Sequence, residues 1–477
     1  MILENPQPPV GGTDSKNWIL LAVGVGSFMS AVDAGAVNTI LPVLRHSFGS
    51  DVGLIEWVVT IYLLVVSGLL LSCGRFADMR GHRDVYICGF GIFVLASALC
   101  GLAPTVGALI AFRALQGIGA ATLFANSTAI LTTNFPASER GRALGLRATA
   151  TYLGLTAGPF LGGWLTAALG WRAVFYINVP IGIVAVALSV RFVPRDRPAP
   201  DRTRFDLAGA VVWMAGLTLL LLALNAGRGR GPASLTSLLL FLLAAVSLGL
   251  FIVIERRTPH PMLDLSLFRN RTFSASSAAN IAHYLCVYMI VFLLPFYLIQ
   301  GRGYGPARTG FILTAQSVAR ACAAPLSGAL SDRIGSRLPA MMGMGVTGIG
   351  LILLSRMGAQ SSLGYVAAAL GITGLGAGIF ISPNNSALMG SAPAGRQGLA
   401  AGVLATARVV GMSLGVAIAG DILAARIAGA HGSDMSSPGA VVNAVSTTFL
   451  AAAGFAVLGI LLAAFERRPG SGEAAQA

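Results

Sequence analysis

The sequence predicts an all-α integral membrane protein with fourteen transmembrane helices. Of its 477 residues, 55% are hydrophobic and only 10% are charged, whereas about a quarter of the residues of a soluble protein are charged. Apolar runs of about 20 residues, the length that crosses a bilayer as a helix, recur along the whole chain. Motifs of the first half also return in the second half. These observations predict two six-helix bundles with two further helices inserted between them.

The apolar runs occur in the order six, two, six, separated by polar segments. Residues 1–17 form a tail, and the first bundle covers residues 18–192, with runs that begin near Trp18, Leu54, Asp84, Val106, Ala143 and Arg172. A linker at 193–206 precedes the two inserted helices at 207–254, and a second linker covers 255–272. The last bundle covers 273–466, with runs that begin near Phe273, Thr309, Leu338, Leu363, Leu399 and Ala444, and a second tail covers 467–477.

The distribution of basic residues predicts the orientation. Most of the 32 lysine and arginine residues fall in segments on the same side as the N-terminus. The positive-inside rule therefore places both termini in the cytoplasm. The formal charge of +14 is scattered between apolar segments rather than gathered on one domain, so we expect lipid and no nucleic acid as a partner. Arginine far outnumbers lysine, as in GC-rich bacteria, which suggests a multi-pass protein of the bacterial cytoplasmic (inner) membrane.

The stretch from Gly141 to Gly163 repeats glycine at four-residue spacing inside an apolar run. Small residues at this spacing line one face of a membrane helix and let two backbones approach closely. Sliding the sequence along itself by 257 positions aligns this stretch with Gly398 to Gly420, with identical residues at most of the glycine positions. A duplicated unit of half a chain is typical of secondary transporters.

A charged loop motif is duplicated as well. GRFADMRGHR runs from Gly74 to Arg83, and GALSDRIGSR runs from Gly328 to Arg337. Each copy has an aspartate at a helix end beside arginines, where a carboxylate pairs with guanidinium groups or favours a neighbouring helix N-terminus. Two matched copies predict a latch that closes the cytoplasmic side by docking on residues near Gly398 and Gly141. Its members are Gly74, Asp78, Arg80, Gly81, Arg83, Asp332, Arg333 and Arg337.

These motifs resemble those of the major facilitator superfamily. The first loop matches the signature GxLaDrxGrk, with Phe76 in place of leucine and Met79 in place of the first basic residue. The pattern GxxxGPxxGG resembles the antiporter motif of the drug exporters of this family. Its residues here are Gly154, Gly158, Pro159, Gly162 and Gly163. With fourteen helices, the chain resembles the drug:proton antiporter branch.

Three charged residues are candidates for proton coupling. Arg113, in LIAFRALQGIGAA, resembles the arginine of the family's proton-linked motif, and its repeat partner is Leu370. Because a charge in lipid is costly, an arginine there tends to be functional. Asp33, in VDAGAVNTILP, lies at a similar expected depth, so we predict that it carries the proton and that Arg113 modulates it. Glu56 is a further acid, for which solvation near the outer end of its helix is an alternative.

Two other arginines lie near the expected bilayer midplane, about 12 and 10 residues into their helices. Arg408 resembles an arginine common on this helix in the branch, so packing or gating is one interpretation; for Arg320 the alternative is pairing with backbone carbonyls. If they face a cavity, they disfavour dicationic compounds and favour neutral, phenolic or carboxylate-bearing ones. The candidate cavity residues are Asn38, Trp57, Tyr62, Gln116, Asn126, Arg320 and Arg408.

The resemblance implies proton-driven export of small organic compounds such as drugs or antibiotics, by alternating access and with the monomer as the functional unit. No GxxxxGK[ST] loop is present, which favours a proton gradient over ATP as the energy source. Uptake by symport is the nearest alternative, and a membrane sensor is a more distant one. No cluster of histidine, cysteine or carboxylate residues at catalytic or metal-binding spacing is found, so we expect no enzyme activity, cofactor or metal.

Overall fold

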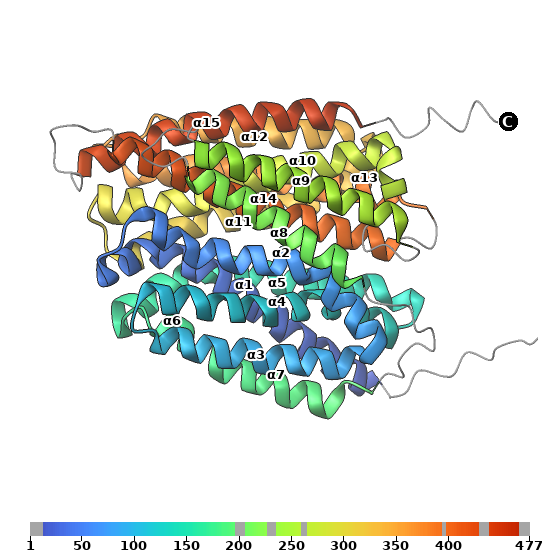
Figure 1. Ribbon diagram of the computed structural model, residues 1–477. Helices are drawn as coiled ribbons and strands as arrows, with labels where there is room; N and C mark the ends of the chain where they lie inside the picture. The colour runs from blue at the N-terminus through green and yellow to red at the C-terminus, as the bar shows by residue number, and fades with distance from the viewer. Residues whose placement is uncertain are drawn as a thin grey trace, which may run out of the picture.

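The computed structural model describes residues 13–195, 206–226, 235–258, 265–393, 397–428 and 438–466. Within these ranges the chain forms fifteen α-helices, one short 3-10 helix and one π-helix, and no strand (Figure 1). The predicted helices are all found within two helical turns of their expected starts. Residues 1–12, 196–205, 259–264 and 467–477, which belong to the expected tails and linkers, lie outside the described residues.

The N-terminal helices are α1 to α7. Their bounds are α1 Thr13–Phe48, α2 Val52–Arg80, α3 His82–Leu102, α4 Val106–Asn134, α5 Ala137–Leu169, α6 Ala173–Tyr176 and α7 Asn178–Phe192. Helix α1 begins before Trp18, so part of the expected tail is helical. The single helix expected near Arg172 is divided into α6 and α7.

Two helices, α8 Leu207–Ala226 and α9 Leu235–Arg257, separate these from the C-terminal helices. The 3-10 helix η1, Leu265–Arg269, occupies part of the second expected linker. The remaining bounds are α10 Arg271–Pro295, the π-helix η2 Phe296–Gly301, α11 Pro306–Ile334, α12 Arg337–Ser355, α13 Leu363–Gly390, α14 Gln397–Ala428 and α15 Pro438–Ala464.

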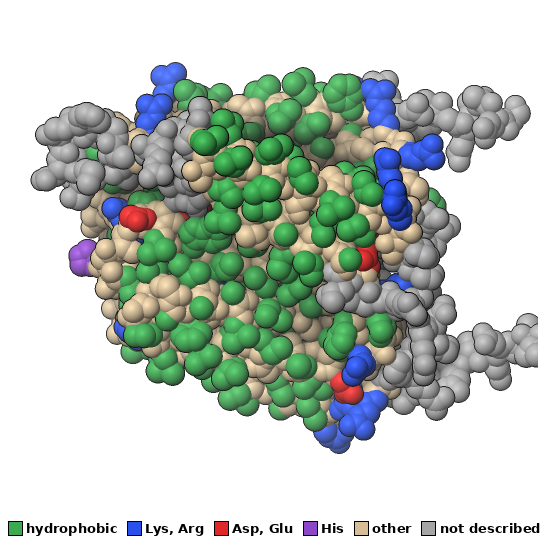
Figure 2. Space-filling model, in the orientation of Figure 1, with side chains coloured by type: hydrophobic (Ala, Val, Ile, Leu, Met, Phe, Trp, Pro, Cys, Tyr) green, Lys and Arg blue, Asp and Glu red, His purple; other side chains and the backbone are tan. Residues whose placement is uncertain are grey.

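The helices have the length, and the surface has the apolar character, of a multi-pass membrane protein. Eleven helical segments among the described residues are long and apolar enough to cross a bilayer, with α6 and α7 counted together. Helix α8 contributes a shorter apolar segment, Ala208–Ala223. Figure 2 shows hydrophobic side chains over the middle of one face, with lysine and arginine gathered toward the two ends. This arrangement fits a belt of lipid around the middle of the helices.

Glycines bring α5 against α1. A Cβ atom added at Gly154 would lie 2.5 Å from the carbonyl oxygen of Phe28, and one at Gly158 would lie 3.0 Å from the Cα atom of Gly35. The same seam recurs between α14 and α10, where a Cβ atom at Gly411 would lie 2.5 Å from the carbonyl oxygen of Ile281. The repeat inferred from the sequence therefore corresponds to a repeated helix contact.

The two charged loops also share a backbone conformation. Gly81, at the end of α2, has φ 99°, and Gly335, at the end of α11, has φ 85°. These left-handed conformations favour glycine, because a Cβ atom there crowds the backbone. Each glycine ends one helix and lets the next begin within two residues.

Both chain ends of the described part, the start of α1 and the end of α15, lie at the same end of the helices in Figure 1. We call this end the terminal side and the opposite end the far side. On the far side, the backbones at Gly163 and Gly310 are in close contact with Pro306 and Pro159, respectively. Arg45 also donates a hydrogen bond of 2.7 Å to the side-chain oxygen of Gln300. These contacts join the N-terminal and C-terminal helices on the far side.

Helices α8 and α9 form a hairpin that lies where the N-terminal and C-terminal helices meet. Leu217 and Leu221 of α8 are buried in one cluster with Leu64 of α2 and Ala417 of α14. The indole nitrogen of Trp213 donates a hydrogen bond of 3.4 Å to the carbonyl oxygen of Ser67. The hairpin therefore packs on both groups of helices at once.

Replacement of Gly154 by alanine tests the close α1–α5 seam. The new methyl group would overlap the Phe28 carbonyl, and such overpacking costs about 1–3 kcal/mol of stability. We expect Gly154→Ala to lower the melting temperature of the purified protein. Gly145→Ala is the matched control, since its Cβ atom would meet nothing within 4 Å. Equal melting temperatures for the two variants would contradict the close seam.

A buried carboxyl group joins three helices on the terminal side, outside the apolar spans. Glu466 follows α15 and is 1% exposed. It accepts hydrogen bonds of 2.9 Å from Ser276 of α10 and 3.3 Å from Ser336, which precedes α12. Burial raises the pKa of Glu466 to about 7, although the two serines and nearby Arg337 oppose the shift.

Stability should consequently depend on pH through Glu466. Since its pKa is higher in the folded protein than the ordinary value of 4.5, the favourable contribution is complete below that value and is lost as pH rises to about 7. We expect Glu466→Gln to melt about 3 °C higher than the wild type in mildly alkaline buffer and to lose this advantage in acidic buffer. A constant difference across that pH range would show that Glu466 does not titrate as described.

Candidate functional site

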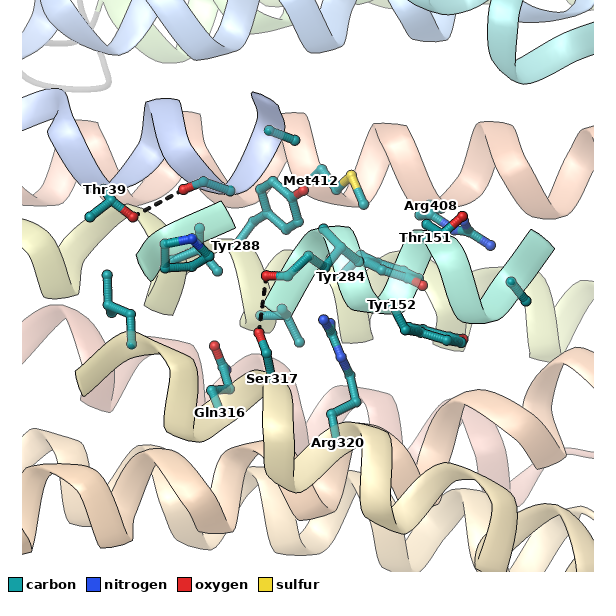
Figure 3. Close-up of a pocket in the computed structure, with 18 of the residues that line it drawn as sticks. Thr39, Thr151, Tyr152, Tyr284, Tyr288, Gln316, Ser317, Arg320, Arg408 and Met412 are labelled. Atoms are coloured by element: carbon teal, nitrogen blue, oxygen red, sulfur yellow. Dashed lines mark hydrogen bonds between the residues drawn. The ribbon is translucent and has the colours of Figure 1, made fainter. Parts of the chain in front are cut away.

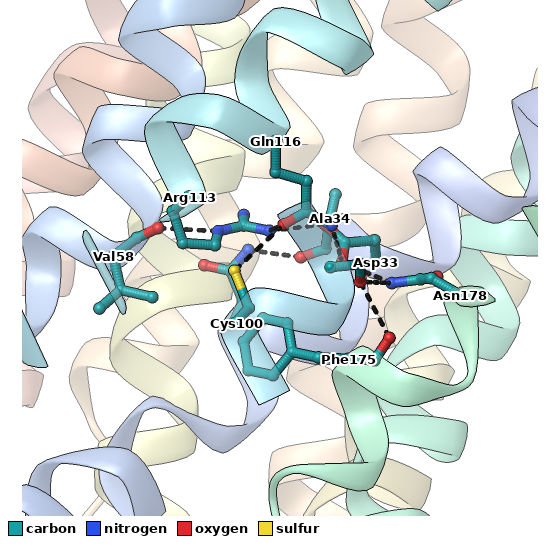
Figure 4. Close-up of polar contacts among 10 residues, drawn as sticks. Asp33, Ala34, Val58, Cys100, Arg113, Gln116, Phe175 and Asn178 are labelled. Atoms are coloured by element: carbon teal, nitrogen blue, oxygen red, sulfur yellow. Dashed lines mark hydrogen bonds and ion pairs between the residues drawn. The ribbon is translucent and has the colours of Figure 1, made fainter. Parts of the chain in front are cut away.

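A buried ion pair forms the centre of a polar network within the N-terminal helices (Figure 4). The guanidinium of Arg113 on α4 donates a hydrogen bond of 2.7 Å from Nη1 to Oδ2 of Asp33 on α1. The side chain of Asp33 is 0% exposed and that of Arg113 is 1% exposed. The sequence placed these residues at similar depths, and the structure brings them into direct contact.

Arg113 has three further partners. Its Nε atom donates to the carbonyl oxygen of Val58 on α2 over 3.1 Å, and its Nη1 atom also donates to Oε1 of Gln116 over 2.7 Å. The guanidinium carbon lies 4.2 Å from the centre of the Tyr62 ring. A hydrogen-bonded arginine over an aromatic face is well held without further charge.

The second oxygen of Asp33 is also occupied. Its Oδ1 atom accepts hydrogen bonds from Gln116 over 3.1 Å and from Asn178 over 2.9 Å. Asn178 lies at the start of α7, where the break after α6 points its side chain into the network. Ser97 of α3 completes the chain by contacting Asn178 over 3.0 Å and donating to the carbonyl oxygen of Phe175 over 2.9 Å.

This network links α2, α3, α4 and α7 to the Asp33 carboxylate on α1. Removing one member of a buried ion pair costs about 3–5 kcal/mol, because the other charge is left without compensation. The carboxylate and guanidinium can therefore exchange partners only if another charge, or a proton, takes the vacated place. A change in the charge of either group would therefore force the network to rearrange.

A cavity of about 260 Å³ lies between the N-terminal and C-terminal helices (Figure 3). It borders the network, because Ala34 and Gly35, which directly follow Asp33, form part of its wall. Its polar lining comes mostly from α5, α10, α11 and α14, with one residue each from α1 and α13. The polar residues that line the cavity are Thr39, Arg147, Thr151, Tyr152, Tyr284, Tyr288, Gln316, Ser317, Arg320, Asn385 and Arg408.

Three arginines share this cavity. Arg147 belongs to α5, Arg320 to α11 and Arg408 to α14. The Nε atom of each is buried and has no hydrogen-bond partner, and Arg147 donates from Nη1 to the neutral hydroxyl of Thr128 over 2.7 Å. No aspartate or glutamate occurs among the described residues that line the cavity. Its wall therefore carries an excess of positive charge.

The candidate cavity residues from the sequence divide into two groups. Arg320 and Arg408 line the cavity, whereas the other candidates are outside its lining. Tyr62 and Gln116 belong to the Asp33 network instead. Asn38 donates to the carbonyl oxygen of Ala34 over 2.7 Å.

Two candidates have contacts elsewhere. Trp57 packs beside the cluster that joins α2 to α8. Asn126 lies 2.8 Å from the ring nitrogen Nδ1 of His82 and donates to the carbonyl oxygen of Thr122 over 2.8 Å. Glu56 is 0% exposed, so the alternative that it is solvated is wrong.

The sequence alone did not single out Arg147, Tyr152 or Tyr288 for the cavity, nor Asn178 and Ser97 for the network. Arg147 lies just one turn inside an apolar run expected to begin near residue 143, where it resembled a charge of the adjoining loop. The structure begins α5 at residue 137, which places Arg147 well inside the helix. The feature of the sequence that could have identified Arg147 is its position within the glycine-rich repeat from Gly141 to Gly163.

The residues of the predicted latch lie on the terminal side. Oδ1 of Asp78 lies 3.2 Å from Nε2 of His82, within the same loop motif, and Asp332 is exposed. Arg80 lies over the ring of Phe76, with its guanidinium carbon 5.7 Å from the ring centre. Docking of the two aspartates on the α14 and α5 segments named above stays a prediction.

Comparison with known proteins identifies the class of protein that this architecture defines. The model of the Major Facilitator Superfamily matches residues 23–268 and 276–477. The chain belongs to this family of membrane transporters.

Its relatives include proteins named for drug resistance and export. The chain is 35% identical over 407 residues to the multidrug resistance protein Stp of Mycobacterium tuberculosis, covering 85% of this chain and 75% of that protein. It is 31% identical to the multidrug transporter protein MdtP of Bacillus subtilis, over 87% and 77% of the two chains. It is also 33% identical to the riboflavin transporter RibZ of Clostridioides difficile, over 95% and 98%.

Solved structures show the same fold. A bacterial homologue of the human lysosomal transporter Spinster, in an inward-facing and unoccupied conformation, superposes with a TM-score of 0.70. The match covers 96% of this chain and 98% of that one, at 15% sequence identity.

Proposed function

We propose that this protein is a proton-coupled antiporter that exports small organic compounds across the bacterial cytoplasmic membrane. The observation that carries the proposal is the buried Asp33–Arg113 pair, which directly adjoins the cavity through Ala34 and Gly35. When a proton binds Asp33, Arg113 loses its counter-charge and the network must rearrange. Movement of α1 would transmit this rearrangement to the cavity wall.

The proposed topology has fourteen membrane crossings. Eleven are the long apolar segments, and α5, α8 and α11 supply the others, with α6 and α7 forming one crossing. The proposed units are two six-helix bundles and the inserted α8–α9 pair. The excess of arginine on the terminal side supports a cytoplasmic location for both termini, and the chain would function as a monomer.

Alternating access would arise from rocking of the two bundles around the cavity. The close contacts of Gly163 with Pro306 and of Gly310 with Pro159 lie on the far side, while the cavity lining reaches α5 and α13 toward the terminal side. We assign this arrangement to a state closed to the outside and accessible from the cytoplasm. The outward-facing state would require the terminal side to close.

Uptake by symport is the alternative function. The name of the riboflavin transporter RibZ favours a nutrient as cargo, whereas the names of Stp and MdtP favour export of drugs. The antiporter motif on α5, at the seam with α1, supports export. Transport direction in vesicles under an imposed proton gradient distinguishes the two functions.

Replacement of Asp33 tests proton coupling. An asparagine side chain would keep the hydrogen-bonding shape but could not release a proton, so we expect Asp33→Asn to lose nearly all gradient-driven efflux in proteoliposomes while retaining measurable substrate binding. Asp84→Asn, which neutralises an exposed carboxylate at the start of α3, should transport like the wild type. Full gradient-driven transport by Asp33→Asn would refute the assignment of Asp33 as proton carrier.

The latch yields a conformational prediction. If Asp78 and Asp332 hold the terminal side shut in the outward-facing state, then neutralising either one removes a contact found in that state alone. We expect Asp78→Asn to increase the fraction of molecules open on the terminal side and to slow transport. Spin-label distances between the terminal-side ends of α2 and α14 measure that fraction, and an unchanged distribution with unchanged transport would contradict the latch.

A further inference from the structure

The cavity combines excess positive charge with aromatic side chains. Its three guanidinium groups come from both halves of the chain, and each leaves its Nε donor without a partner. The carboxylate beside the cavity, Asp33, is already paired with Arg113 at 2.7 Å and with two amide donors. It therefore provides little compensation for the charge of the cavity wall.

Tyrosine rings hold two of these arginines in place. The guanidinium carbon of Arg408 lies 5.5 Å from the ring centre of Tyr284, and that of Arg320 lies 6.0 Å from the ring centre of Tyr152. Contact with a ring face leaves the N–H edges of a guanidinium free for an acceptor. Figure 3 shows Arg320 extending toward Tyr152 and Tyr284, with Arg408 on the other side of these rings.

We propose that this cavity binds planar aromatic anions, with the negative group between the arginines and the ring system against the tyrosines. In surroundings of low dielectric constant, three uncompensated guanidinium groups repel a cation and stabilise an anion far more strongly than in water. The phenolic rings of Tyr152, Tyr284 and Tyr288 offer stacking surfaces and hydroxyl donors. The volume of about 260 Å³ lies just below the range of about 300–1,000 Å³ for pockets of drug-sized ligands, so it suits a compound of a few fused rings.

This inference names the substrate class of the proposed exporter and so rests on that proposal, but its test requires no gradient. The probes are fluorescein, an anion in alkaline buffer, and rhodamine 123, a cation with the same xanthene ring system. Binding of each dye to the purified full-length protein is followed by fluorescence anisotropy in neutral detergent. We expect fluorescein to bind at least about tenfold more tightly than rhodamine 123.

Variants then assign the preference to the cavity. Arg320→Gln and Arg408→Gln should each weaken fluorescein binding about tenfold, as expected for loss of a charge-assisted contact, and should not weaken rhodamine 123 binding. Arg320→Lys should restore part of the affinity. Arg356→Gln removes the same charge from an exposed site at the end of α12 and should bind both dyes like the wild type.

Several results would overturn the proposal. They are equal or tighter binding of rhodamine 123 by the wild type, absence of fluorescein binding, or glutamine variants that bind fluorescein as the wild type does. The wild-type comparison needs no substitution, so a variant that fails to fold does not remove the test. If the wild type prefers the anion but shows no gradient-driven transport, the proton-coupled function alone is refuted.

Discussion

The structure depends most on the ion pair between Asp33 and Arg113, because either charge is costly to bury in a membrane protein without the other. Their 2.7 Å contact fixes the relative depth of α1 and α4, and the additional hydrogen bonds to Val58 and Asn178 extend the constraint to α2 and α7. A neutral core could have accommodated small rotations of these helices at little cost. The paired charges allow few arrangements of these helices, and neutralising either charge would change which arrangements are possible.

Glycine provides the complementary constraint. At Gly154 and Gly158 the backbones of α1 and α5 approach so closely that a methyl group would overlap a carbonyl or a neighbouring Cα atom. Helices in lipid gain little from hydrophobic burial against one another, so such close van der Waals packing supplies much of their association. Since Asp33 and Gly35 are on the same helix, the seam that positions α5 also adjoins the proton-coupling candidate and the cavity wall.

Duplication preserved this packing but not the chemistry. Gly411 contacts the backbone of α10 as Gly154 contacts that of α1, and the glycines that end α2 and α11 both have positive φ angles. In contrast, Leu370 occupies the position equivalent to Arg113, and the C-terminal helices contribute two arginines to the cavity. One half thus contains the ion pair, while the other provides most of the positive charge that lines the cavity.

The amino-acid sequence by itself determined the helices, the duplication and the charged turns, because runs of apolar residues, four-residue glycine spacing and left-handed glycines are local features. It also placed Asp33 and Arg113 at a common depth, since helical rise per residue is fixed. The tertiary structure alone decided that Asn178 joins that pair and that Arg147 enters the cavity while Trp57 does not. Membrane helices are apolar on most sides, so sequence periodicity says little about the direction in which each side chain points; contacts with neighbouring helices set that rotation.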